Sequence, residues 1–288
     1  MLNFPVVDTH LHVWDPGNKL DYRLAKELPP VFNKPYLLED YNRACDPVQV
    51  EKMVFIQCEV AASQFMDEAE WVTSLAKVDT RLEGIVPWAP LEKGDAVRSD
   101  LEKLAENRLI KGIRHLIQFE DDLDFCLRPD FVAGVRTLAD YNLSFDIGIF
   151  HIHMANTIQM VRQCPNVQFV LDHIGAPDIK NQGFEPWAQE IKQLSEMPNV
   201  WCKISAVPDH ADHENWTKED LKPYIDHVIS CFGFDRVMYG GNWPVSTLAT
   251  EYPRWVETLA WAVSGCTDTE LKKLFRDNGI AFYKLGAD

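Results

Sequence analysis

The chain has 288 residues, 46% of them hydrophobic and 25% charged, an ordinary composition for a globular protein. Its 28 basic and 44 acidic residues give a formal net charge of −16, which repels nucleic-acid phosphates and anionic membrane surfaces. No apolar run approaches the roughly 20 residues that a membrane span requires, and the N-terminus lacks the segments of a secretory signal. The seven cysteines have no zinc-finger spacing. We therefore expect a cytoplasmic protein that binds neither nucleic acid nor membrane.

Eight short runs rich in Val, Ile and Phe alternate with amphipathic stretches, a pattern typical of parallel strands alternating with helices. The apolar runs span residues 4–14, 50–60, 82–91, 110–119, 143–153, 167–177, 200–207 and 235–245. Helical patterns follow at residues 64–78, 96–107, 128–142, 154–164, 184–197, 217–232 and 252–263. This alternation predicts an α/β fold, a (β/α)8 TIM barrel forming one domain over residues 1–288. A doubly wound sheet is the alternative, but no GxGxxG motif follows an early strand.

The segment from Pro16 to Pro47 has no clean hydrophobic period. We expect it to form a long first βα loop with short helices, lying over the mouth of the barrel.

Polar residues that close the apolar runs are the functional candidates, because a TIM barrel places its active site at the carboxyl ends of its strands. They are His10, His12, Gln57, Glu59, Trp88, Arg114, His115, Gln118, His151, His153, Asp172, His173, Lys203, Ser205, Asn242 and Trp243. We expect Gln118 and His151 to contact substrate, although the end of the fifth run is ambiguous around His151 and His153.

His10 and His12 stand two residues apart on a strand, so both side chains are expected on one face, where they could hold one metal ion. A lone HxH is a weak signal, and two hydrogen-bonding core histidines would give the same pattern. Asp8 is expected on the same face, either as a ligand, as a group that orients the imidazoles, or as a structural carboxylate.

His173 lies where the sixth strand becomes a loop, and a neutral imidazole there could transfer a proton. Arg114 and Lys203 are cations beside apolar runs, so they could bind or polarise a substrate carbonyl. An internal ion pair with Asp146 or Asp172 is the alternative for both cations.

Several tryptophans could have either a binding or a packing role. Trp14, Trp88 and Trp243 lie at strand ends, where they could form an apolar wall against a sugar ring or a lid on the core. Trp255 and Trp261 in the last helical pattern could mark a contact in a homo-oligomer, although core packing explains them equally well.

Five motifs in strand order carry a family resemblance: VVDTHLHVW, KGIRHLIQ, VLDHIGAP, CKIS and RVMYGGNWPV. Together they resemble the lactonase branch of the amidohydrolase superfamily, which includes sugar-acid lactonases and 2-pyrone-4,6-dicarboxylate lactonase. The resemblance covers essentially the whole chain. It implies a barrel that hydrolyses a cyclic ester, with His10, His12 and His173 matching the site histidines of the family.

The resemblance also implies at most one divalent metal, Zn²⁺ being the first choice, held beside His10 and His12. Metal-independent activity stays open, since the branch varies in this respect. Lys111 opens its strand rather than closing it, so the bridging lysine of binuclear relatives has no match here.

Asn242 departs from the family, whose members typically carry aspartate there as the base that activates water. An amide cannot accept that proton, and losing a general base costs about 100- to 10,000-fold in rate. Three accounts fit: an engineered Asp-to-Asn change, a natural lineage in which another group such as His173 moves the proton, or loss of catalysis.

The favoured hypothesis is hydrolysis of an aldonolactone, such as L-rhamnono-, L-fucono- or L-galactonolactone, in carbohydrate catabolism. His173, Lys203 and Asn242 are the predicted catalytic residues, and Arg114 is predicted to bind substrate. The rival hypotheses are a lactone isomerase, a decarboxylase on the same barrel, or a sugar-acid binding protein without activity.

Overall fold

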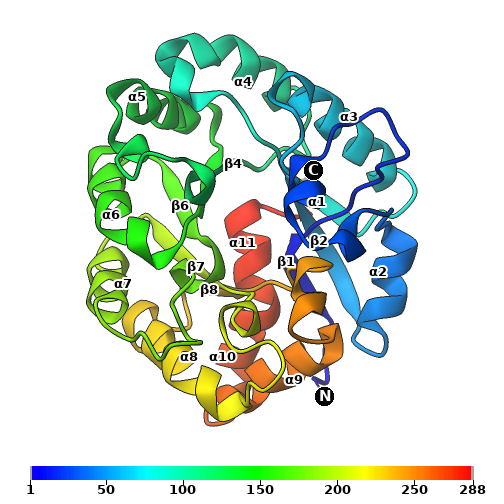
Figure 1. Ribbon diagram of the computed structural model, residues 1–288, viewed down its shortest axis with the longest axis vertical. Helices are drawn as coiled ribbons and strands as arrows, with labels where there is room; N and C mark the ends of the chain where they lie inside the picture. Colours follow the sequence, from blue (N-terminus) through cyan, green and yellow to red (C-terminus); the bar gives the residue numbers. More distant parts are fainter. Residues whose placement is uncertain (1, 287–288) are drawn as a thin grey trace.

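The computed structural model describes residues 2–286 and contains eight parallel strands surrounded by helices (Figure 1). The strands are β1 (Val6–Leu11), β2 (Val50–Ile56), β3 (Leu82–Val86), β4 (Gly112–Leu116), β5 (Ser144–Gly148), β6 (Gln168–Leu171), β7 (Val200–Ile204) and β8 (Val237–Tyr239). Nearly all strand residues are buried, because helices cover the outer face of the sheet and side chains fill its interior.

Short bridges join the two hydrogen-bonded sheets, β1-β2-β3 and β4-β5-β6-β7-β8. At one seam Ile85 pairs with Ile110, just before β4. At the other seam Leu11 pairs with Trp243, which follows β8. There the backbone N–H of Asn242 donates to the backbone carbonyl of His10 at 2.8 Å. The strands therefore follow one another around a ring in chain order, as the predicted TIM barrel requires.

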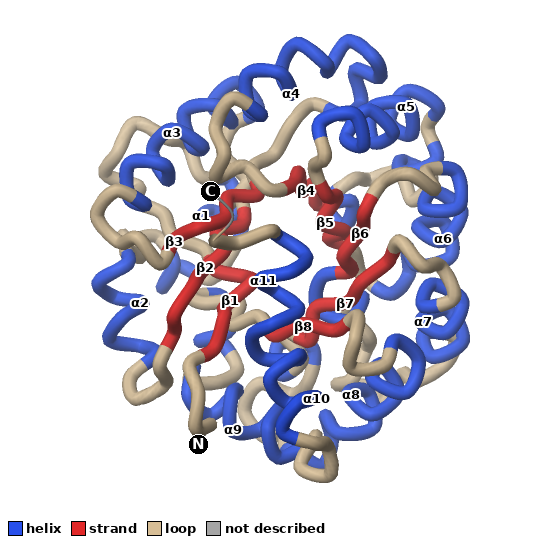
Figure 2. The backbone as a smooth tube through the Cα atoms, turned by 180° about the vertical axis from the view of Figure 1, so that it is seen from behind, coloured by secondary structure: helices blue, strands red, loops and turns tan. Residues whose placement is uncertain are grey.

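Most of the helices form an outer layer, seen as a ring around the strands in Figure 2, and the last helix lies inside that ring. They are α1 (Arg23–Glu27), α2 (Leu38–Cys45), α3 (Phe65–Ala76), α4 (Arg98–Ala105), α5 (Pro129–Thr137), α6 (Met154–Gln163), α7 (Trp187–Ser195), α8 (Lys218–Phe232), α9 (Tyr252–Ala262), α10 (Asp268–Lys272) and α11 (Asn278–Tyr283). The predicted helical patterns correspond to α3 to α9. No helix among the described residues is long and apolar enough to cross a membrane.

The long first loop packs onto the barrel through Trp14. This side chain is fully buried, pairs through its backbone with Tyr36, and donates its indole N–H to the carbonyl of Phe32 at 3.1 Å. Because Trp14 is enclosed by its own loop, its role in the structure is packing.

Helix α11 lies across the amino-terminal end of the barrel, at the centre of Figures 1 and 2. Its Tyr283, followed by Leu285, packs into an apolar cluster with residues of five strands. The strand members are Val7, Val54, Ile56, Val86, Val170 and Met238. This end of the barrel is therefore closed by hydrophobic packing.

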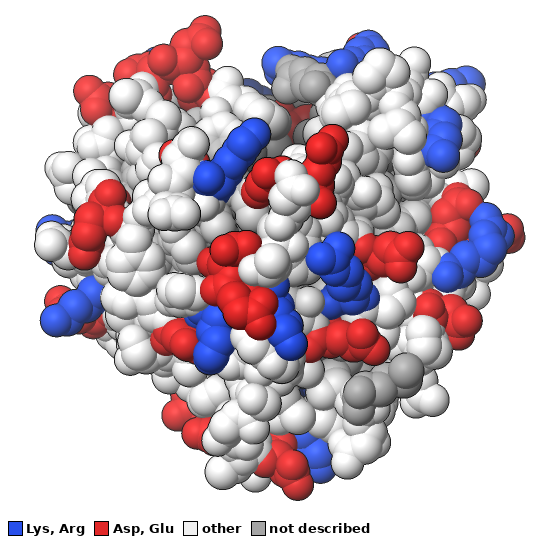
Figure 3. Space-filling view, turned by 60° about the horizontal axis from the view of Figure 1, so that its bottom comes forward, with Lys and Arg blue, Asp and Glu red and all other residues white. Residues whose placement is uncertain are grey.

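Two expectations need correction. The fifth strand ends at Gly148, and His151–His153 form a 3₁₀ turn rather than strand. Trp255 is 1% exposed and donates its indole N–H to the carbonyl of Gly240, so it belongs to the core and cannot mark a subunit contact. On the face seen in Figure 3, acidic and basic side chains are interspersed.

Candidate active site

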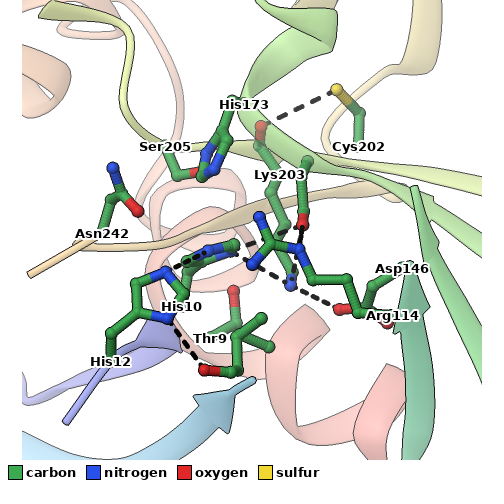
Figure 4. Close-up of polar contacts among 12 residues, drawn as sticks. Thr9, His10, His12, Arg114, Asp146, His173, Cys202, Lys203, Ser205 and Asn242 are labelled. Atoms are coloured by element: carbon green, nitrogen blue, oxygen red, sulfur yellow. Dashed lines mark hydrogen bonds and ion pairs between the residues drawn. The ribbon is translucent and has the colours of Figure 1, made fainter. Parts of the chain in front are cut away.

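Six predicted side chains come together at the carboxyl ends of the strands (Figure 4). They come from β1 and the residue just after it, from β4 and β7, and from the turns after β6 and β8: His10, His12, Arg114, His173, Lys203 and Asn242. All six are at least nine-tenths buried, so this cluster lies deep in the mouth of the barrel.

His10 and His12 point their Nε2 atoms at each other, 3.2 Å apart. His12 Nδ1 lies 2.8 Å from the carbonyl oxygen of Ile56, which can only accept, so Nδ1 carries the proton. Burial lowers the pKa of His12 to about 3, which leaves this imidazole neutral with a free lone pair on Nε2. The side chain is therefore ready to accept a proton or to bind a metal ion.

His10 has a partner for either tautomer. Its Nδ1 lies 3.4 Å from Asp172 Oδ1 and 3.5 Å from Lys203 Nζ. With the proton on Nδ1, His10 faces the carboxylate and leaves Nε2 bare beside His12. With the proton on Nε2, it donates to His12 and accepts from Lys203.

Four charged side chains form a buried network under the histidines. Lys203 Nζ lies 2.7 Å from Asp146 Oδ2 and 3.0 Å from Asp172 Oδ1, while Arg114 Nε lies 3.0 Å from Asp172 Oδ2. Burial acts to raise the pKa of Asp172, but Lys203, His10 and Arg114 outweigh it and hold that pKa well below its usual range. The internal ion pairs considered as an alternative for both cations are thus present.

His173 begins a turn with left-handed backbone, at φ 56°. Its Nδ1 lies 2.8 Å from the hydroxyl of Ser205, and its ring centroid lies 4.4 Å from that of His10. Burial lowers the pKa of His173 well below its ordinary value, so the imidazole is neutral. Residues with such backbone strain concentrate at functional sites, and Ala206 and Asn242 share it.

The side-chain amide of Asn242 is held through its nitrogen. Its Nδ2 donates to Asp209 Oδ2 at 2.7 Å, and in Figure 4 its oxygen lies on the side of the histidines. Asp209 was not among the predicted site residues, because it lies five residues beyond the end of β7 at Ile204. The only sequence signal is the polar segment DHADH after an apolar run.

Asp8 does not face the histidines. Its carboxylate accepts from the hydroxyls of Tyr41 and Tyr252 and from the backbone amides of His10 and Gly241. The strand register shifts between Asp8 and Leu11, and this irregularity turns His10 inward while Asp8 faces the helices. The same-face expectation for Asp8 was therefore wrong, and its role is to tie β1 to the turn before Asn242.

The other predicted contacts lie around this cluster. Trp243 is buried against Tyr36 and Tyr41. Trp88 is half-buried and lines a cavity of about 310 Å³ with Glu59 and other residues. Gln118 is half-buried in the turn after β4, and His151 Nδ1 lies 3.2 Å from the carbonyl of Ala176. Their predicted roles in substrate binding stay predictions.

The donor set fits one divalent ion. His10 and His12 offer two neutral imidazole nitrogens that face each other. The other ring nitrogen of His10 lies beside the Asp172 carboxylate and that of His12 beside the Ile56 carbonyl, as in many zinc sites. Donor atoms of His10, Asp172 and His173 also lie within 4.8 Å of one another. Because Lys203 and Arg114 occupy the Asp172 oxygens, His10 and His12 are the residues that could hold such an ion.

Comparison with known proteins identifies the family. The model of the amidohydrolase family matches residues 7–285, so the chain belongs to this family. It is 25% identical over 285 residues to L-fucono-1,5-lactonase of Burkholderia ambifaria, covering 97% of this chain and 95% of that protein. It is 33% identical over 259 residues to 2-pyrone-4,6-dicarboxylate hydrolase of Comamonas testosteroni, covering 86% and 79%.

A solved amidohydrolase from Burkholderia multivorans shares the fold. Its crystal structure, described as having bound zinc, superposes with a TM-score of 0.87 at 24% identity and covers 98% of this chain and 100% of that one. The TIM-barrel prediction and the family resemblance are both confirmed. The protein is accordingly a hydrolase of the amidohydrolase family.

Proposed function

We propose that this protein hydrolyses a sugar-acid lactone to the open aldonic acid in carbohydrate catabolism. The observation that carries the proposal is the buried pair of neutral imidazoles, His10 and His12, at the mouth of an amidohydrolase barrel. The similarity to a protein named L-fucono-1,5-lactonase, over nearly the full length of both chains, supports a lactone as substrate.

A divalent ion held by His10 and His12, zinc being our first choice, would supply Lewis acidity toward the lactone carbonyl. The chain's own residues supply the rest. Arg114 and Lys203 fix Asp172, which in turn orients His10, so both cations act here through position rather than through direct contact. His173 uses Nδ1 for Ser205, which leaves Nε2 to meet a substrate hydroxyl or the ring oxygen.

A sugar lactone suits the site better than an aromatic dicarboxylate. Two substrate carboxylates would call for free arginines that bind them in a bidentate manner. Arg114 is the arginine of the cluster, and Asp172 already holds its Nε at 3.0 Å. Neutral histidines can bind the hydroxyl groups of a sugar lactone without such a cation.

The test is stopped-flow proton release with L-fucono-, L-rhamnono-, L-galactono- and D-galactonolactone, each against a buffer blank, because lactones also open spontaneously. We expect at least one to open faster with enzyme, and His12→Asn to lower kcat/KM by about 100-fold or more. His227→Asn is the matched control, since His227 bonds the carbonyl of Ala188 in the helical layer. Treatment with a chelator reports on the metal.

Failure of all four lactones would refute the proposal. Product NMR then separates the rivals, because a ring-shifted lactone, a decarboxylated product and an unchanged bound ligand give different spectra.

A further inference from the structure

Asp209 is a carboxylate at the barrel mouth that the roles described above leave without a function. Its Oδ2 accepts from Asn242 Nδ2 at 2.7 Å, while its Oδ1 is buried and has no hydrogen-bond partner in the described part of the chain. A buried carboxylate oxygen without a donor costs stability, so its persistence calls for a functional reason.

The neighbours of Asp209 leave this oxygen free. Its own backbone carbonyl accepts from His213 Nε2 at 2.8 Å, and the adjacent His210 has a buried Nε2 that also lacks a partner. The ring of His210 lies 6.4 Å from that of His173. Two unsatisfied polar atoms on consecutive residues, beside two residues of the site, mark a place that a substrate or water can complete.

We propose that Asp209 supplies the carboxylate that position 242 lacks and acts as the general base for the water that opens the lactone. The inference rests on the proposed hydrolysis. It assigns Asn242 a positioning role: the amide holds Asp209 through Nδ2 and presents its own oxygen toward the histidines. In this pair the carboxylate lies after β7 and the amide lies after β8.

The hydrogen bond between Asn242 and Asp209 explains why an aspartate is unsuitable at position 242 in this chain. Two carboxylates in place of the present pair would have oxygens about 2.7 Å apart and would have to share a proton. An amide opposite a carboxylate has no such conflict, because the N–H donates and the carboxylate accepts. Each residue therefore fixes the identity of the other.

The step balances. Asp209 Oδ1 takes a proton from water as the water oxygen bonds to the lactone carbonyl carbon. The ring C–O bond then breaks, and the protonated Asp209 returns the proton to the ring oxygen, which leaves as a hydroxyl. The new carboxylic acid ionises and releases one proton to solvent, which is the signal in the stopped-flow assay.

Asp209→Asn is the decisive variant, because the new amide oxygen can still accept from Asn242 but cannot take a proton. We expect kcat to fall by about 100-fold or more, with a much smaller change in KM. Asp212→Asn is the matched control: Asp212 lies three residues on, and its exposed carboxylate accepts from the backbone of Glu214 at 3.1 Å. That control should keep the activity of the unmodified protein.

The double variant Asp209→Asn with Asn242→Asp moves the carboxylate back. We expect it to recover at least about 10-fold in kcat over Asp209→Asn alone. Retention of more than a third of the kcat by Asp209→Asn, or absence of recovery in the double variant, would overturn the proposal.

A second measurement does not depend on the substrate, so it distinguishes this inference from failure of the proposed function. Asn242→Asp alone should lower Tm at pH 8 by about 5 °C or more and recover at pH 5, while the double variant should show no such loss. If no lactone is opened, lactone hydrolysis fails but the coupling of the two positions is still tested. An unchanged pH dependence of Tm in Asn242→Asp would refute that coupling.

Discussion

The two ends of the barrel interior are built from the same strands but have opposite chemistry, and they meet in one layer of side chains. Toward α11, strand side chains form an apolar cluster. Toward the mouth lies the buried network of Asp146, Asp172, Lys203 and Arg114. In strand register its Asp146 pairs with Val170 and its Lys203 with Met238, both members of the apolar cluster. The apolar end gains stability by burial, whereas the charged end costs desolvation that its ion pairs must offset.

The change happens within a few residues of a single strand. On β6, Val170 belongs to the apolar cluster, and Asp172 immediately after the strand holds two cations. Stability and function therefore divide along the strand direction, which is the general rule for this fold. Three experiments test how completely they are separated.

The largest expected effect comes from Lys203→Met. It leaves Asp146 and Asp172 buried without their shared cation, which we expect to cost about 3–5 kcal/mol of unfolding free energy and most of the activity. Urea unfolding measures the loss. The double variant Lys203→Met with Asp146→Asn should be less destabilised than the single one, and an equal or larger loss would contradict the network.

Val54→Ala tests the apolar end with an intermediate effect. Val54 is fully buried in the apolar cluster, and its methyl groups approach Gly84. Removing two methyl groups should cost about 2 kcal/mol, equally at pH 5 and pH 8, and leave kcat within about 3-fold. A loss of activity larger than the loss of folded protein would show that the two ends are coupled.

The smallest effect is the pH dependence that Asp209 gives to stability. Burial raises the pKa of this half-buried carboxyl from 3.8 to about 6 in the folded protein. The folded state therefore holds a proton more tightly than the unfolded state between these values, so stability falls as pH rises from about 4 to 6 and is level above. Asp209→Asn removes this loss. Between pH 4 and pH 7 its free energy of unfolding should therefore rise by roughly 1–2 kcal/mol relative to that of the unmodified protein. Parallel stability curves for the two proteins would contradict this.

Parallel strands buried on both faces appear in the sequence as continuous apolar runs, whereas the flanking helices do not. Much of the fold could therefore be predicted from the sequence. All eight runs contain a strand. The end of the fifth run was misjudged, because Phe150 and Ile152 extend the apolar pattern although both side chains are exposed. Sequence alone cannot distinguish an apolar residue in a strand from one in a surface turn.

The candidate site was predictable where its residues adjoin strands. His10, His12 and Lys203 lie on or beside strands whose order fixes their place in the ring. Asp209 depends instead on the path of a loop, and the face of Asp8 depends on one irregularity in strand register. Neither the path of that loop nor the register irregularity can be predicted from local hydrophobicity.

Helix α11 gives the charged end a dependence on the far end of the chain. The hydroxyl of Tyr283 donates to Asp146, the carboxylate that also holds Lys203. During synthesis, His10 of β1 and His12 just after it leave the ribosome early, while the phenol that completes the network leaves among the last of the described residues. The full set of contacts around Asp146 and Lys203 is therefore available only once the last helix has been made and has packed against the strands.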